Sequence, residues 1–273
     1  MKKDNDYSII RFNLLTSLLS ILNKNDENDT DFIIAKYILN NRDAIIDTSI
    51  YKVAEDCYVS RSSVQRFIKN IGYDSFTQMK QNLRDVIQHE DALLQYTDHT
   101  DYSTYLKDSV RNMTDDIAKT ARSNGFKKLV DRFVKARSIV ILVAEDSAHA
   151  CRFLQQQLLA IGKLIRIISS ASKNISLLDT MESEDLLLVC SVTGNFALAI
   201  DDQLKENKAT KCLITLNRTT AFENTYSFIY YMNDDINISS HSINMLKNVY
   251  TTYGLTFLFD LFYHECYLYY SKQ

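Results

Sequence analysis

The spacing of apolar residues changes near Arg137 and divides the chain into two structural classes. Before that point, apolar residues recur every three or four positions, which is typical of amphipathic helices. After it, short runs rich in Ile, Leu and Val alternate with segments of helical spacing, such as 148–162 and 196–207. Buried strands that alternate with helices predict a parallel sheet covered on both faces. The predicted strands are Ile139–Ala144, Leu164–Ile168, Leu186–Cys190, Cys212–Leu216 and Phe228–Met232.

A polar stretch at residues 89–104 separates the helical region from the rest of the chain. We therefore predict a two-domain protein: an all-α N-terminal domain over residues 1–88, a linker over 89–104, and an α/β domain over 105–273. The last segment, residues 243–270, is rich in aromatic residues and is predicted to be a long helix that forms core or a subunit interface.

The composition argues against several classes of protein. The 31 Lys and Arg residues against 34 Asp and Glu residues give a net charge of −3, which by itself indicates no partner. The chain has no proline and five glycines, and none of the glycines falls in a phosphate-binding loop pattern. The five cysteines are scattered, so we expect neither a zinc site nor a disulfide framework, and a cytoplasmic location is favoured. We expect no cofactor, no secretory signal and no membrane-spanning segment.

The segment Ile50–Lys69 has the spacing of a helix-turn-helix. Its apolar residues fall where two short helices would cross and where the turn would close, and the small Ala54 would let the two backbones approach. These apolar residues are Val53, Ala54, Val59, Val64, Phe67 and Ile68. A second helix with an apolar underside and a polar front is the form that enters the major groove of DNA. A helical hairpin that only packs remains the alternative, because the bare spacing also occurs by chance.

Local charge favours DNA binding over simple packing. Between Arg61 and Arg84 the sequence has five basic residues and one acid, Asp74, although the whole chain is slightly acidic. A concentrated positive patch supplies affinity for phosphates, and Arg and Gln side chains read guanine and adenine edges. The predicted DNA-binding residues are Ser60, Arg61, Ser62, Ser63, Gln65, Arg66 and Lys69.

The same residues resemble a known family. The runs Val53–Glu55 and Val59–Lys80 are similar to the helix-turn-helix of the RpiR family of bacterial transcriptional regulators, with Ser63, Asn70, Ile71 and Tyr73 as departures from its pattern. Tyr58 stands at the tight-turn position that is often Gly in the family. A left-handed backbone there is strained for Tyr, so the sequence favours a turn that is built differently.

The resemblance also implies the nature of the second domain. RpiR regulators carry a sugar-isomerase-type (SIS) domain with a five-stranded parallel sheet, in which two loops hold a sugar phosphate. The matching loops here are Ala144–Ser147, where both family glycines are replaced and two carboxylates are present, and Ser191–Phe196. The effector-binding residues that the resemblance implies are Ser147, Ser191, Thr193, Gly194 and Asn195.

Two interpretations of these loops remain open. In the first, the loops bind a sugar or sugar-phosphate effector. Carboxylates repel a phosphate dianion by about 1 kcal/mol or more, so a neutral or cationic sugar is also compatible. In the second, the polar residues only cap helices, and the domain serves oligomerisation alone.

A sugar-phosphate isomerase is the rival class of function. Isomerisation needs a base near the sugar, and His149 and Glu223 are candidates by loose position, but they belong to no recognisable constellation. His264 and Cys266 are two residues apart on a predicted helix, so they point to different faces and are poor metal ligands. We therefore expect a non-enzymatic transcriptional regulator of carbohydrate metabolism. It is expected to bind double-stranded DNA at a palindromic operator as a homodimer or homotetramer.

Overall fold

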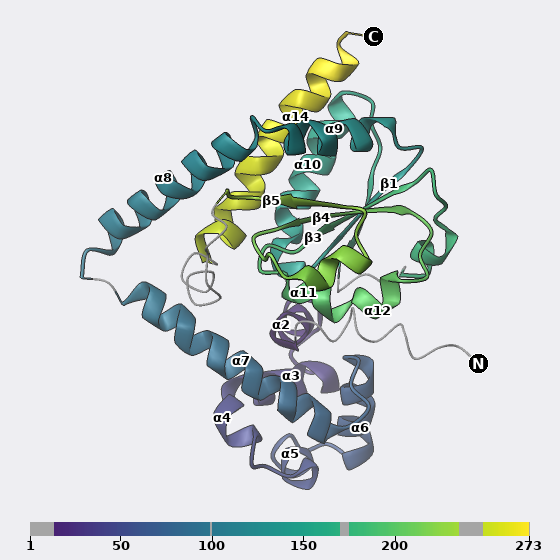
Figure 1. Ribbon diagram of the computed structural model, residues 1–273. Helices are drawn as coiled ribbons and strands as arrows, with labels where there is room; N and C mark the ends of the chain where they lie inside the picture. The colour runs from purple at the N-terminus through teal and green to yellow at the C-terminus, as the bar shows by residue number, and fades with distance from the viewer. Residues whose placement is uncertain (1–13, 99, 170–174, 235–247, 273) are drawn as a thin grey trace. The chain divides into compact units, whose positions relative to one another are not determined.

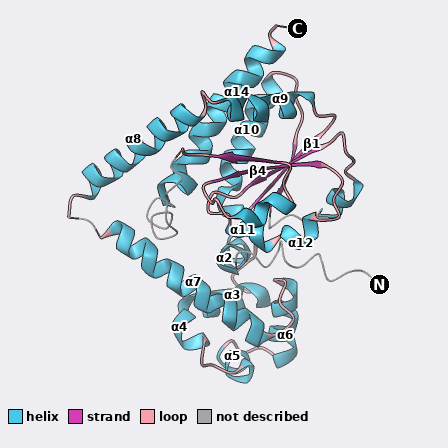
Figure 2. Cartoon of the chain, viewed as in Figure 1, coloured by secondary structure: helices cyan, strands magenta, loops and turns pink. Residues whose placement is uncertain are grey.

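The computed structural model describes residues 14–98, 100–169, 175–234 and 248–272. The chain divides into two compact units, with the boundary in the sequence between Gln95 and Tyr96 (Figure 1). Within the described residues, the strands belong to the second unit, and the first is helical (Figure 2). The N-terminal residues 1–13, part of the domain predicted over 1–88, lie outside the described residues.

Helices build the first unit around its own apolar core. They are α2 (Leu14–Lys24), α3 (Thr30–Asn40), α4 (Arg42–Ile45), α5 (Ile50–Asp56), α6 (Arg61–Asn70) and α7 (Phe76–Thr97). The core draws on all of them and includes Leu18, Ile34, Val53 and Phe67, each with no exposed surface. The helix-turn-helix predicted over Ile50–Lys69 therefore shares a core with α3 and α7.

The stretch predicted as a linker is mostly helical. Helix α7 continues to Thr97, and α8 begins at Tyr102, so both helices enter residues 89–104. The stretch has neither proline nor glycine, and a polar sequence does not by itself stop a helix. The boundary between the two units does fall within this polar stretch, but most of the stretch is helix and not extended chain.

The second unit contains the predicted five-stranded parallel sheet. The strands are β1 (Ile139–Val143), β2 (Arg166–Ser169), β3 (Leu186–Cys190), β4 (Thr210–Thr215) and β5 (Phe228–Tyr231). Their order in the sheet is β2-β1-β3-β4-β5, and all pairs are parallel. The chain moves outward from β1 to β2 and then returns to the other side of β1 for β3. This reversal places a topological switch point between β1 and β3.

Helices cover the two faces of the sheet. The helices of this unit are α8 (Tyr102–Thr120), α9 (Asn124–Lys135), α10 (Ala148–Ala160), α11 (Asn195–Ala199), α12 (Asp201–Leu204) and α14 (Leu255–Tyr270). Helices α9, α10 and α14 lie together on one side of the sheet, and α11 and α12 lie on the other (Figure 1). Part of the segment predicted as a long aromatic helix is core, since Leu258, Phe259 and Phe262 are buried against α9 and α10, whereas Tyr253 is exposed. Residues 243–247 of that segment lie outside the described residues.

A buried carboxylate fixes the edge where β1 and β3 begin. Asp185 is 3% exposed and accepts bonds from the Arg137 guanidinium (Nε 3.0 Å, Nη2 2.8 Å), the Ser138 hydroxyl and the Glu182 amide. These donors, the Arg137 guanidinium above all, hold the pKa of Asp185 far below its usual value. The carboxylate therefore joins the residues that precede the two central strands.

Candidate nucleic-acid interface and ligand loops

The turn between α5 and α6 is closed by a left-handed residue. Tyr58 has φ 55°, and it is the one residue other than glycine with positive φ in the described part of the chain. The Val59 amide donates to the Ala54 carbonyl (2.9 Å) and the Tyr58 amide to the Glu55 carbonyl (3.1 Å), the bond pair of a Schellman helix end. The prediction that Tyr would force a different turn is therefore wrong. The two bonds hold Tyr in a conformation that costs about 1–2 kcal/mol.

Helix α6 has the two-sided character that groove entry requires. Val64, Phe67 and Ile68 are buried in the core of the first unit. Ser60 caps the helix, and its hydroxyl accepts a bond from the Ser63 amide at 3.0 Å. The remaining predicted DNA-binding side chains lie on the outer face: Arg61, Ser62, Gln65, Arg66 and Lys69 are exposed, and Ser63 is half-buried.

The cations of this unit are in different environments. The Arg61 guanidinium lies over the ring of Tyr51, 4.8 Å from its centroid, at the beginning of α5. By contrast, Lys52 forms ion pairs with Asp56 (2.7 Å) and Glu55 (3.5 Å), and the bond to Asp56 raises its pKa. Lys80 is half-buried and donates to the Thr48 carbonyl at 3.1 Å. Helix α6 therefore contributes three exposed cations, Arg61, Arg66 and Lys69, and Arg84 on α7 is exposed as well.

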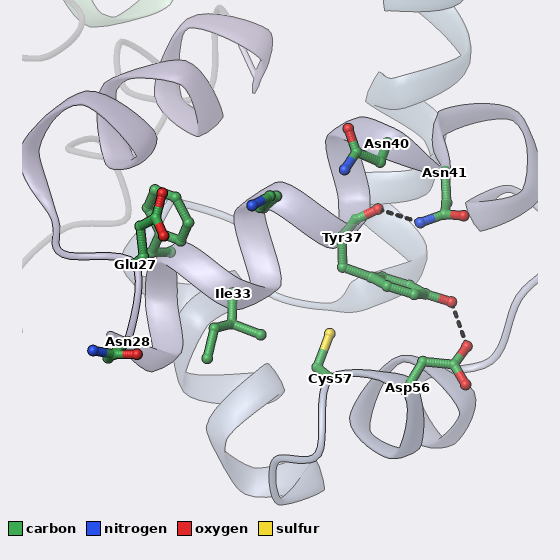
Figure 3. A pocket seen from close by; sticks show the side chains of 10 residues that line it. Glu27, Asn28, Ile33, Tyr37, Asn40, Asn41, Asp56 and Cys57 are labelled. Atoms are coloured by element: carbon green, nitrogen blue, oxygen red, sulfur yellow. Dashed lines mark hydrogen bonds between the residues drawn. The ribbon is translucent and has the colours of Figure 1, made fainter.

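A hydrogen bond connects α3 to α5, the first helix of the helix-turn-helix. The Tyr37 hydroxyl donates to the Asp56 carboxylate at 2.5 Å, and the two residues border a cavity of about 350 Å³ (Figure 3). The bond raises the pKa of Tyr37 to about 12, while Lys52 and Tyr37 lower the pKa of Asp56. Cys57 also borders the cavity, and burial raises the pKa of its thiol to about 11, so it stays protonated at neutral pH. Sequence reasoning missed this pair because the residues are 19 positions apart.

The predicted ligand loops flank the switch point of the sheet. Val143, the last residue of β1, pairs with Cys190, the last residue of β3. The loops that contain Ser147 and Ser191–Asn195 therefore leave adjacent strands at the same edge, where open α/β sheets bind ligands. Ser147 and Ser191 are both buried, whereas Asn195 is exposed.

Much of the second loop is held by its own hydrogen bonds. The Ser191 hydroxyl accepts from the Ala197 amide (3.2 Å), and the Thr193 hydroxyl from the Asn195 amide (3.4 Å). Gly194 has φ 81°, and a side chain there would place Cβ 2.7 Å from Cβ of Asn217. The hydroxyls of Ser191 and Thr193 are thus both engaged by amides in the first turn of α11.

Asn217 is a residue of this site that the sequence did not reveal. It follows β4, donates to the Thr193 carbonyl at 3.0 Å, and accepts from the Thr219 amide at 3.0 Å. It therefore joins the loop after β3 to the loop after β4. The contact depends on the order of strands in the sheet, and the signal that could have found it is a polar residue directly after a buried strand.

The first loop is acidic, but one of its charges is paired. The Glu145 carboxylate forms an ion pair with Arg152 on α10 at 2.7 Å, whereas Asp146 is exposed. Glu145, Asp146 and Arg152 together carry a net charge of −1. The loop therefore repels a phosphate less than two unpaired carboxylates would.

The residues considered for catalysis or metal binding are not gathered into one site. His149 is exposed on α10 with Nδ1 3.2 Å from the Asp146 carbonyl, and Glu223 is exposed on a 3₁₀ turn after β4. On α14, His264 is exposed and Cys266 is buried, as expected for different faces of a helix. In the described residues, no three His, Cys, Asp or Glu side chains are placed to share a metal ion. No described helix is long and apolar enough to cross a bilayer.

Comparison with known proteins identifies the first unit. Residues 12–90 match the helix-turn-helix domain of the rpiR family. The chain is 24% identical over 168 residues to the HTH-type transcriptional regulator GlvR of Bacillus subtilis, covering 61% of this chain and 62% of GlvR. It is also 28% identical over 199 residues to an uncharacterized HTH-type transcriptional regulator of Thermotoga maritima, covering 68% and 69%. The match thus spans less than two thirds of the length of GlvR.

Two solved structures contain chains to which this chain is similar. One is the NanR protein of Vibrio vulnificus complexed with ManNAc-6P, with 18% identity, a TM-score of 0.46 and 95% of each chain covered. The other is the sugar isomerase domain of an RpiR transcription factor from Sphaerobacter thermophilus, with 14% identity and a TM-score of 0.44 over 59% of this chain and 89% of that one. The helix-turn-helix geometry and the family match agree on the first unit. The N-terminal unit of this chain is a helix-turn-helix domain of the RpiR family.

Proposed function

We propose that this chain is a sequence-specific DNA-binding regulator of transcription and that α6 is its recognition helix. The observation that carries the proposal is the arrangement of α6: its underside is buried, its first turn is capped by Ser60, and Arg61, Gln65 and Arg66 are exposed beyond the cap. Arg and Gln in this position can contact base edges, while Ser60 and Lys69 suit phosphates. The protein acts as a cytoplasmic regulator and not as an enzyme.

The proposed assembly is a homodimer or homotetramer on a palindromic operator. Two recognition helices related by a two-fold axis would enter half-sites separated by about 34 Å or a multiple of it. A monomer at micromolar concentration, measured by size exclusion with light scattering, would contradict this part of the proposal.

We infer that the C-terminal unit carries the regulatory signal. The loops after β1 and β3 leave adjacent strands at the switch point, which supports a ligand site formed by Ser147, Ser191, Thr193, Gly194 and Asn195. A sugar-derived effector there would connect the regulator to carbohydrate metabolism. An effector changes DNA binding only if its affinity differs between the DNA-competent and incompetent states.

Selection of bound DNA from a random oligonucleotide pool tests the proposed function directly. The full chain should enrich a palindrome, and the Arg61→Ala and Arg66→Ala double variant should enrich none while keeping the wild-type melting temperature. Failure of the wild-type chain to enrich any sequence would contradict the proposal.

A further inference from the structure

Tyr58 combines an unfavourable backbone with an unused side chain. Its φ of 55° lies in the left-handed region that favours glycine, and its side chain is 97% exposed. Burial of the ring would offset the cost of the strained backbone, because it would remove apolar surface from water. The ring of Tyr58, however, buries almost no surface. A strained residue that contributes nothing to packing points to a role outside the fold.

Two other helix ends in the chain show what the fold alone requires at such a position. Helices α6 and α10 end with the same pair of backbone bonds, and in both the left-handed residue is glycine: Gly72 (φ 91°) and Gly162 (φ 75°). The three ends therefore differ in the side chain that they carry. Since glycine serves the geometry at the other two, the phenol of Tyr58 is not needed to close the turn.

The place of Tyr58 in the hairpin indicates what its ring meets. It lies two residues before Ser60, so it belongs to the connection that leads into the first turn of α6. A recognition helix enters the major groove with its N-terminal residues. The connection just before that helix consequently lies at the rim of the groove, where the sugar-phosphate backbone runs. Arg61 follows three residues after Tyr58 and is exposed, so a cation that attracts phosphate lies close to it in the chain.

We propose that Tyr58 contacts the operator backbone, with its phenolic hydroxyl donating a hydrogen bond to a phosphate oxygen. The proposal rests on the proposed DNA-binding function and assigns one further residue to it. Tyrosine is among the side chains that donate to phosphates, and such contacts set the register of the protein on DNA without reading sequence. Because the phenol is neutral, the contact releases no counterion and leaves the salt dependence of binding unchanged.

Three variants of the full chain test the contact, on the DNA that the wild type selects. Tyr58→Phe should weaken binding about fivefold, Tyr58→Gly at least as much, and Tyr267→Phe, at an exposed tyrosine of α14, not at all. Tyr58→Gly should also raise the melting temperature, because glycine relieves the left-handed strain. The selected consensus and the slope of log affinity against log salt should both stay as in the wild type.

The outcomes separate this inference from the proposed function. If the wild type selects a palindrome but Tyr58→Phe and Tyr58→Gly bind it as tightly, the contact is wrong and the function stands. A changed consensus in Tyr58→Phe would overturn the phosphate contact in favour of base reading. If the wild type selects no sequence, the proposed function itself fails.

Discussion

The guanidinium carbon of Arg61 lies over the ring of Tyr51, 4.8 Å from the ring centroid. Tyr51 is the second residue of α5 and Arg61 the first of α6, so the contact joins the beginnings of the two helices of the hairpin. The contact thereby restricts the orientation of a long side chain at the beginning of the proposed recognition helix in the absence of DNA. Less rotamer freedom then has to be lost on binding.

We expect Tyr51→Ala to weaken operator binding about two- to fivefold, because an exposed cation–aromatic contact is worth about 0.5–1 kcal/mol. Tyr51→Phe keeps the ring and should bind like the wild type. Tyr51 is 63% exposed, so neither change should move the melting temperature by more than about 1 °C. Fluorescence anisotropy titrations with labelled operator measure the effect. Equal losses for both variants would mean that the hydroxyl, and not the ring under Arg61, is what matters.

Arg66 lies on the exposed face of α6, and we expect Arg66→Ala to reduce operator affinity about tenfold or more without loss of stability. If Arg66 contacts a phosphate, the slope of log affinity against log salt should fall by about one. If it contacts a base, the selected consensus should become degenerate at one position in each half-site.

The matched control is Arg122→Ala, which removes an exposed arginine from the second unit and should leave DNA binding unchanged. A fall in melting temperature that parallels the loss of affinity would show that Arg66 is structural.

The acidic first ligand loop leads us to expect that a cationic sugar such as glucosamine stabilises the chain more than a sugar phosphate does. Glu145, Asp146 and Arg152 carry a net charge of −1, which attracts an ammonium group and opposes a phosphate. At about ten times its dissociation constant, a ligand should raise the melting temperature by about 3 °C. Differential scanning fluorimetry with both sugars at equal concentration decides the matter, and an equal or reversed order of shifts would refute it.

Gly194→Ala should lower the free energy of unfolding by about 2 kcal/mol, because it adds a steric clash to a strained backbone. The new Cβ would lie 2.7 Å from Cβ of Asn217, and φ at this position is 81°. Gly162→Ala is the natural control: φ there is 75°, but nothing lies within 4 Å of its added Cβ. It should cost only the backbone term of about 1 kcal/mol. Similar losses in urea unfolding for the two variants would show that the contact with Asn217 is unimportant.

The depressed pKa of Asp185 predicts how the second unit responds to acid. A carboxyl whose pKa is lowered by folding contributes its full stability above its unfolded pKa of about 3.9, and that contribution is lost as the pH falls toward the folded pKa. Asp185→Asn should therefore reduce the free energy of unfolding at pH 7 by about 2 kcal/mol. The difference between variant and wild type should shrink at pH 3. Urea titrations at the two pH values, followed in the second unit, test this, and a constant difference would contradict it.

The sequence predicted those parts of the structure that depend on local pattern. The buried strands were found because parallel strands read as short apolar runs, although β2 begins at Arg166 and not at Leu164, whose side chain is 76% exposed. The hairpin of α5 and α6 was found from its apolar spacing. The extent of α7 was missed, since residues 89–104 were interpreted as a polar linker although they include Ala92, Leu93 and Leu94.

Contacts between residues far apart in the sequence could not be predicted from the spacing of apolar residues. The bond of Tyr37 to Asp56, the stacking of Arg61 on Tyr51 and the bridge from Asn217 to Thr193 each join two elements. Each depends on how those elements pack, and packing is not encoded in the spacing of apolar residues. The left-handed Tyr58 was judged wrongly for the same reason: the intrinsic preference of Tyr was weighed without the two backbone bonds that override it.

The side-chain amide of Asn217 connects the loop after β3 to the loop after β4 by hydrogen bonds. A molecule that displaces the Thr193 carbonyl by even a fraction of an ångström must either stretch the bond from Asn217 or carry the start of the following 3₁₀ turn along through Thr219. Asn217 thereby connects the end of β3 to the segment that leads into the edge strand β5 through side-chain hydrogen bonds.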